Sequence, residues 1–346
     1  MKKCLVIMVS AILLVICGSC QRRPFAEHQS KVAINIDIKT DIVNLSDVKL
    51  PENIRVDLYD PETARLVYTD YVGPKGGYIH PVAGVYDMIV YSIGTENTIV
   101  HNEHNYNEIE AYTNEVSSFI KSQLSSFLAK RAQAAKERAA KKYAEKQAAG
   151  LITKEPEQYV EEPVVNQPDH IFVGWYHNLE IPVIYEHDEV KEILVEVDLH
   201  TIVETWVVEF RNIEGTQWVN SMVALISGQR GSVHIGPNVA SEKVVSLYFD
   251  LIKTKTKSGT KIAQGTYNTF GIHPEHQDDI WIDLSVKDTG GEEHVYHFDV
   301  SDYFIDNEER RIIIEDPVVV EEPKVQGGGF QPVVEGWEDV TTDIIL

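Results

Sequence analysis

Cysteine is almost absent from this chain, and the few positions where it occurs are informative. All three cysteines lie within the first 20 of 346 residues, and the last is Cys20. Lys2 and Lys3 precede a short apolar stretch at 5–16, and small residues lead up to Cys20. This order is typical of a secretion signal. We therefore predict a signal peptide at 1–19, cleaved before a cysteine whose thiol then carries lipid.

Long apolar runs are missing too. The stretch at 5–16 is shorter than the about 20 apolar residues that span a bilayer, which favours a cleaved signal over a membrane helix. Cleavage leaves Cys20 as the only cysteine, so internal disulfides, cysteine-ligated zinc and a thiol nucleophile are excluded from the rest of the chain. Stability must come from apolar burial, for which a chain of this length is ample.

Positive charge is scarce. The chain has 31 Lys and Arg against 54 Asp and Glu, a formal net charge of −23. Loss of Lys2 and Lys3 with the signal makes it −25. A general nucleic-acid binder shows the opposite sign, so we predict no nucleic-acid partner. An acidic, solvated surface keeps an exposed protein soluble.

The first part of the mature chain has the pattern of β-strands. After a polar tether at 20–30, apolar residues alternate with polar ones from Val32 to Ile38 and again from Ile54 to Tyr59. A period of two indicates a strand with one buried face. Further strand-like segments follow, separated by Gly and Pro. We predict an antiparallel β-sandwich over 31–113.

The next segment is the one local reversal of charge. Val116, Ile120, Leu124 and Phe127 fall at helical spacing, and 129–149 is rich in Ala, Lys, Arg, Glu and Gln. These features predict a basic helix over 114–149, with its first half packed and its second half solvated. Gly150 is suited to end it. An acidic, Pro-containing linker is expected at 150–168.

A second β-rich region follows at 169–346. Short alternating segments are separated by turn residues, and we predict a second antiparallel sandwich. The chain ends on Ile344, Ile345 and Leu346, which favours a packed final strand within 330–346. The predicted fold class is therefore all-β, with two antiparallel β-sandwich domains and an inserted or linking α-helix.

The order of short motifs resembles a known family. The lipobox cysteine is followed by Arg22-Arg23-Pro24, and later motifs include Gly84-Val85-Tyr86, Glu110-Ala111-Tyr112-Thr113, Pro168-Asp169-His170-Ile171-Phe172-Val173, Ile226-Ser227-Gly228, Thr269-Phe270-Gly271 and Trp337. In this order they resemble the fimbrillin-like outer-membrane lipoproteins of Bacteroidales, in an uncharacterised two-domain branch. The resemblance covers most of 20–346.

This resemblance implies that the two sandwiches are of transthyretin-like or Greek-key type. It also implies outer-membrane placement, with the periplasmic or the extracellular face left open. It also implies a structural or adhesive role in fimbriae, in which one subunit supplies a strand to the sheet of another. The expected partners are the membrane, through lipid on Cys20, and fimbrial subunits or other envelope proteins. The long basic helix at 114–149 departs from the family pattern.

No set of residues indicates catalysis. The histidine pairs His101/His104 and His273/His276 do not match His-Glu-x-x-His, which places two imidazoles on one helix face. Solvated charge explains Asp278-Asp279 and the acidic pairs Glu161-Glu162 and Glu308-Glu309, and Gly327-Gly328-Gly329 lacks the residues of a phosphate loop. We therefore predict no metal, no cofactor and no enzyme activity.

The alternative function is that of a surface glycan-binding lipoprotein for nutrient capture. Five tryptophans could build a platform on which sugars stack, although packing in the core or on a sheet face is the favoured explanation: Trp175, Trp206, Trp218, Trp281 and Trp337. Exposed aromatic side chains lining one groove would favour this alternative. The sequence identifies one functional residue with a mechanism, which is Cys20.

Overall fold

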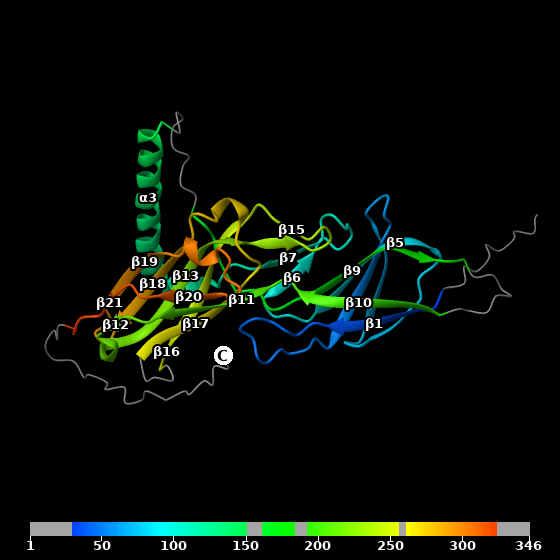
Figure 1. The fold of residues 1–346 in the computed structure, drawn as a ribbon, viewed down its shortest axis with the longest axis horizontal. Helices are drawn as coiled ribbons and strands as arrows, with labels where there is room; N and C mark the ends of the chain where they lie inside the picture. The colour runs from blue at the N-terminus through cyan, green and yellow to red at the C-terminus, as the bar shows by residue number, and fades with distance from the viewer. Residues whose placement is uncertain (1–29, 151–160, 184–191, 256–260, 324–346) are drawn as a thin grey trace, which may run out of the picture.

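The computed structural model describes residues 30–150, 161–183, 192–255 and 261–323. Strands dominate these residues, which confirms the all-β class. Figure 1 shows two sandwiches along the long axis of the molecule, with the helix α3 (Ser125–Ala148) standing on one of them. The predicted signal peptide, the tether before Ser30, the glycine run and the predicted final strand lie outside the described residues.

The first sandwich is one path of seven strands in the order β3-β2-β5-β9-β10-β1-β4. The predicted alternation at its start is confirmed, because Val32 and Ile34 are buried in the same core as Ile54, Val56 and Leu58. The strand bounds are β1 Val32–Ile38, β2 Asn53–Tyr59, β3 Leu66–Val72, β4 Gly76–Ile79, β5 Gly84–Ile93, β9 Phe172–Ile181 and β10 Ile193–Thr201.

The long strand β10 folds this path into two layers. Its first seven residues pair with β1 in parallel, and its last two pair with β9. The parallel pairing differs from the predicted all-antiparallel sandwich. One face of β10 buries Val195, Val197 and Leu199 between the layers, while the residues between them face outward.

The second sandwich follows the order β19-β18-β13-β16-β17-β11-β20, with the short β8 pairing β16. Here β16 is the strand shared by the two layers, pairing β13 along its first part and β17 along its last. The bounds are β8 Val164–Val165, β11 Glu204–Phe210, β13 Val219–Arg230, β16 Val244–Lys255, β17 Lys261–Thr269, β18 Trp281–Asp288, β19 Glu293–Asp299 and β20 Arg311–Ile314, with β12 Ile213–Glu214 pairing β21 Val318–Val319.

A four-stranded sheet, β15-β14-β7-β6, connects the two sandwiches. It takes β6 (Thr98–His101) and β7 (Glu110–Thr113) from the first half of the chain, and β14 (Ser232–His234) and β15 (Val239–Ala240) from the second. Its apolar side packs on the outer face of the first sandwich, in a core with Tyr59, Ile89, Tyr91, Ile109, Val173, Val203, Val233, Ile235 and Phe270. The two halves therefore share a core at their junction.

The strand pairing differs from the predicted division of the chain at 168/169. β9 and β10 belong to the first sandwich, although they follow the helix and the linker in sequence. Alternation along a strand specifies which of its faces is buried, but it does not specify the partner strand. The helical segment is therefore an insertion between strands of one sheet rather than a spacer between two separate sheets.

The basic segment forms two helices, α2 (Ser118–Gln123) and α3. The Ser117 side chain accepts a hydrogen bond from the Ile120 N–H (3.3 Å), which caps the start of α2. Gly150 has a φ of 71° and its N–H donates to the Gln147 carbonyl, so it ends α3 as the sequence predicts. None of the described helices is long and apolar enough to cross a membrane.

We expect Ile109→Ala to lower the free energy of unfolding by about 2–5 kcal/mol, because it leaves a cavity in the shared core at the junction. Ile109 is fully buried there. Urea denaturation measures the change. Val67→Ala is the control, since Val67 is 52% exposed on β3 and its truncation should cost less than about 1 kcal/mol. Equal effects of the two substitutions would show that the connecting sheet contributes little.

Candidate interaction site

Cys20, the one predicted site residue, lies outside the described residues, so its lipidation stays a prediction. The described chain begins at Ser30, whose N–H donates to the Pro81 carbonyl (3.0 Å) and whose hydroxyl donates to the Pro182 carbonyl (3.4 Å). These contacts lie at the end of the first sandwich where β1 starts. The chain therefore enters the fold at this end, far from the second sandwich (Figure 1).

The basic helix is fixed to the second sandwich by a buried carboxylate. Asp283 on β18 has no exposed surface, and its oxygens lie 2.8 Å from Arg131 Nε, 2.6 Å from His297 Nδ1 and 3.5 Å from Arg138 Nη1. Arg131 is itself 3% exposed and lies 3.7 Å from Glu162. Because a buried charge is costly unless it is paired, these residues hold one another in place.

The surroundings of Asp283 keep it ionised. Burial alone would raise the pKa of its carboxyl group. The hydrogen bond with His297 and the charges of Arg131 and Arg138 outweigh burial, and the pKa lies below its ordinary value. The ion pair with α3 is therefore present throughout the neutral range of pH.

The contact continues along α3. The Arg138 guanidinium lies 4.2 Å from the centroid of the Trp281 ring, and Lys142 Nζ lies 3.3 Å from Asp279. Along one helix face, the spacings are four, seven and four for Phe127, which is fully buried, Arg131, Arg138 and Lys142. The expectation of a solvated second half is therefore wrong at Arg131, which is buried, and Arg138 and Lys142 are only partly exposed on the same face. The spacing of Arg131, Arg138 and Lys142 in the sequence was the signal that could have revealed this contact between α3 and the second sandwich.

One strand edge of the second sandwich is completed by side chains instead of a neighbouring strand. Among the described strands, β20 pairs with β11 alone, in parallel, and the carbonyls of Ile314 and of Arg310 just before the strand accept from Arg211 and Val207. Since carbonyls alternate in direction along a strand, those of Arg311 and Ile313 point away from the sheet. Asn307 Nδ2 donates to the Arg311 carbonyl (2.8 Å), and the Tyr303 hydroxyl donates to the Ile313 carbonyl.

A hollow beside β20 leaves room for a further segment of chain. It has a volume of about 490 Å³ and is lined by Arg211, Tyr303, Ile313, Glu315, Asp316 and Pro317. The exposed side chain of Ile305 lies in the same capping segment, which runs from Ser301 to Asn307. The edge of β20 thus carries backbone groups that are suited to strand pairing.

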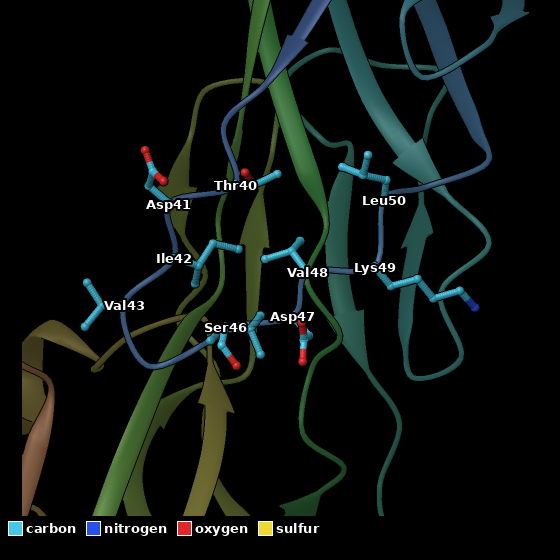
Figure 2. Close-up of a pocket in the computed structure, with 10 residues that line it drawn as sticks. Thr40, Asp41, Ile42, Val43, Ser46, Asp47, Val48, Lys49 and Leu50 are labelled. Carbon is cyan, nitrogen blue, oxygen red and sulfur yellow. The ribbon is translucent and has the colours of Figure 1, made fainter. Parts of the chain in front are cut away.

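A larger hollow of about 890 Å³ lies along the loop between β1 and β2 (Figure 2). Figure 2 shows Ile42 and Val48 pointing toward each other across this loop. Asn44 anchors it to the second sandwich, donating from Nδ2 to the carbonyls of Thr205 (3.2 Å) and Arg310 (3.1 Å). One loop supplies all of the residues that line this hollow, and through Asn44 that loop joins the two sandwiches.

The histidines singled out in the sequence serve local structure. His101 Nε2 lies 2.7 Å from a Glu110 oxygen on the adjacent strand, whereas His104 is exposed. The rings of His273 and His276 contact each other edge to face. Asp279 pairs with α3, as described above.

The acidic pairs noted in the sequence lie apart from one another. Glu162 belongs to the Arg131 network, and Glu308 and Glu309 are exposed on the turn before β20. A group the sequence reasoning missed is Asp288, Glu292 and His294, whose ligand atoms lie within 4.8 Å of one another. The Asp288 carboxylate accepts from the Glu292 N–H (2.8 Å) there, so closure of the β18–β19 turn explains this group.

The described tryptophans do not form a platform for sugars. Trp206 is buried, Trp175 donates its N–H to the Ile235 carbonyl (2.7 Å), and Trp281 is covered by Arg138. Trp218 is half-buried against the core of the second sandwich. Trp337 lies outside the described residues.

A family model described as "Domain of unknown function (DUF5119)" matches residues 19–250. The chain belongs to this family. A curated protein of Bacteroides ovatus, named "Putative fimbrium anchoring subunit Fim4B", is 30% identical over 107 residues. That match spans 31% of this chain and 31% of the relative, so the chain spans about a third of the length of the curated relative it matches.

The fold of this DUF5119 member is similar to that of a solved protein. A structure described as a "putative adhesin" from Bacteroides ovatus is 19% identical, with a TM-score of 0.57 over 88% of this chain and 98% of that chain. The fimbrial anchor protein Mfa2 from Porphyromonas gingivalis is 11% identical, with a TM-score of 0.47 over 82% and 90%. The resemblance to fimbrillin-like proteins predicted from the sequence is confirmed.

We expect Asp283→Asn to expose α3, because the substitution removes the nearer counter-charge of the buried Arg131 and leaves it only Glu162 at 3.7 Å; loss of one partner of a buried ion pair typically costs about 3–5 kcal/mol. Limited trypsin digestion followed by mass spectrometry should show faster cleavage after Arg131 and Arg138. Glu145→Gln is the control, since Glu145 is exposed and its one ion pair, with Lys141 at 4.0 Å, is also exposed and therefore weak. Cleavage at the wild-type rate in the Asp283 variant would contradict the assigned docking role.

The docking of α3 on Asp283 also has an expected dependence on pH. A carboxyl group whose pKa is lower in the folded than in the unfolded protein stabilises the fold above the unfolded value of about 3.9, and this contribution disappears as the pH falls through the folded pKa. Hydrogen exchange should therefore show α3 protected at pH 5 and released only below about pH 4. Release of α3 between pH 7 and 5 would contradict the assignment of this pH dependence to Asp283.

Proposed function

We propose that this chain is a lipid-anchored component of the cell envelope with a structural or adhesive, non-enzymatic role in a fimbrial assembly. Cleavage before Cys20 leaves a cysteine for acylation, and the chain is then held at the outer membrane. The curated relative named as a fimbrium anchoring subunit supports the assembly, and the order of motifs supports the anchor. Partner subunits join it by strand pairing.

The observation that carries this proposal is the edge of β20. An added strand would supply backbone N–H groups to the Arg311 and Ile313 carbonyls, replacing the donors from Asn307 and Tyr303. Each side-chain cap contributes about 0.5–1.5 kcal/mol net, an amount that a row of backbone hydrogen bonds and buried side chains can offset. The hollow of about 490 Å³ beside β20 gives an incoming strand a place for its side chains.

The anchor is tested by Cys20→Ser. Without the thiol no acyl group can be attached, and we expect the protein to move from the membrane fraction to the soluble fraction. Mass spectrometry of the wild-type N-terminal peptide should show diacylglycerol on Cys20. A wild-type peptide without lipid, or a variant that stays in the membrane fraction after a salt wash, would contradict anchoring through Cys20.

The acceptor edge is tested by Ile313→Pro. The N–H of this residue points away from β11, so proline removes only an outward donor and is tolerated on an edge strand. The ring should also obstruct an incoming strand. We expect capture of fimbrial subunits from solubilised membranes to fall to background, with little change in the melting temperature.

Ile313→Val is the matched control, since it keeps the backbone N–H and nearly all of the side chain. It should capture fimbrial subunits as the wild type does. A folded Ile313→Pro protein that captures as many subunits as the wild type would exclude β20 as the acceptor edge.

A further inference from the structure

Exposed apolar side chains gather at the end of the first sandwich where the described chain begins. Five of the fifteen large hydrophobic residues exposed among the described residues lie there, although this end is a small part of the surface. The connectivity explains the grouping, because β4 and β9 end where β1, β5 and β10 start. We call this group the apolar end patch: Tyr78, Val82, Val85, Val183 and Leu194.

Part of the patch is a continuous row across three strands. Ala33 on β1 is the direct partner of Leu194 on β10 and of Tyr78 on β4. Paired residues share a face of a sheet, so these side chains lie side by side on the outer face. Leu194 is 59% exposed and Tyr78 is 52% exposed. An exposed apolar group of this kind marks a contact surface.

Charged residues border both sides of the patch: Glu180 is the direct partner of Val85 on the opposite outer face of the sandwich, and Lys31 lies beside the row that contains Tyr78. Lys31 Nζ lies 3.9 Å from the centroid of the Tyr78 ring and 3.6 Å from Glu192. Tyrosine and lysine both present an apolar body and a polar tip, which suits the boundary between lipid and water. This aromatic and cationic pair gives the patch the chemistry of a membrane interface.

Farther along the same sheet face the character changes. The outward residues that follow Leu194 on β10 are Glu196 and Asp198, and β1 places Asp37 directly opposite Asp198. All three are exposed, and because Lys39 pairs with both Asp37 and Asp198, the group keeps a net negative charge. An anionic lipid surface repels these acids, so it would favour contact through the strand starts and hold the rest of the face away.

We propose that the apolar end patch contacts the lipid bilayer to which Cys20 is attached, and this inference rests on the proposed lipid anchor. Nine residues separate Cys20 from Ser30. At most about 3.5 Å per residue, they reach about 30 Å, so the patch stays close to the bilayer. The molecule then stands on this end, with β20 and α3 held away from the membrane.

The test places a photo-crosslinking amino acid at Leu194 in the full-length protein expressed in its envelope. Leu194→benzoylphenylalanine should give adducts with phospholipid, identified by mass. The matched control is Ile252→benzoylphenylalanine, since Ile252 is 56% exposed but lies on β16 of the second sandwich. We expect lipid adducts at the first position and none at the second.

A second arm makes the result independent of acylation in the cell. The processed chain has one cysteine, so Cys20 can be coupled to a maleimide lipid in vesicles of phosphatidylethanolamine and phosphatidylglycerol. Tyr78→Ser in the Leu194 crosslinker chain should then reduce lipid adducts roughly tenfold, since it removes about 1.4 kcal/mol or more of apolar contact. A melting curve confirms that the variant is folded.

The outcomes separate this inference from the proposed anchor. If Cys20 carries no lipid in the cell, the proposed anchor is overturned. The experiment in vesicles still measures whether the apolar end patch contacts the bilayer. Protein adducts at Leu194 in place of lipid, no adducts at all, or equal lipid adducts at Leu194 and Ile252 would each overturn contact between patch and bilayer.

Discussion

The pairing of β7 with β14 is the constraint on which the rest of this structure depends. β7 comes from the first half of the chain and β14 from the second, and Ala111 lies opposite Val233 in the middle of the pair. Both side chains are buried in the core between the sandwiches. Because a sheet and a core cross the junction, the two sandwiches cannot move independently without breaking both. The relative positions of the two ends are fixed in this way.

The charges of this molecule fall into two groups: ion pairs between α3 and the second sandwich, and an acidic outer surface. The chain is strongly acidic, yet the positive charges of the inserted helix are used inside it, against Asp283 and Glu162. This face of the helix is therefore not a free basic arm, because the buried Arg131 and the partly buried Arg138 already have their counter-charges. The outer surface stays acidic, which keeps an exposed protein soluble.

The sequence predicted elements better than it predicted partners. Alternation gave the buried faces of β1 and β2 correctly, and the helical spacing up to Phe127 gave the packed half of the insertion. Alternation could not assign β10 to the first sandwich, because the sequence pattern of a strand is the same whichever sheet the strand joins. Arg131 was expected in solvent, since burial of an arginine depends on an acid 152 positions away in the chain.

The candidate site was the part least open to sequence reasoning. Cys20 could be predicted because lipid attachment is specified by a local motif. The acceptor edge could not, because it depends on which backbone groups of β20 remain outside the sheet and on Tyr303 and Asn307 folding back onto them. No short motif records such an arrangement, since any polar side chain after a turn can supply the donor.

On the proposed arrangement, tension runs from the lipid into β1 and leaves through a strand added to β20. The path crosses two parallel pairs, β1 with β10 and β11 with β20, and β10 continues directly into β11 through residues 202–203. β1 is pulled from its start while β10 is pulled from its end, so the load shears seven paired positions together instead of opening them one at a time. The parallel pairs that depart from the predicted antiparallel fold are therefore the ones that suit an anchored protein under load.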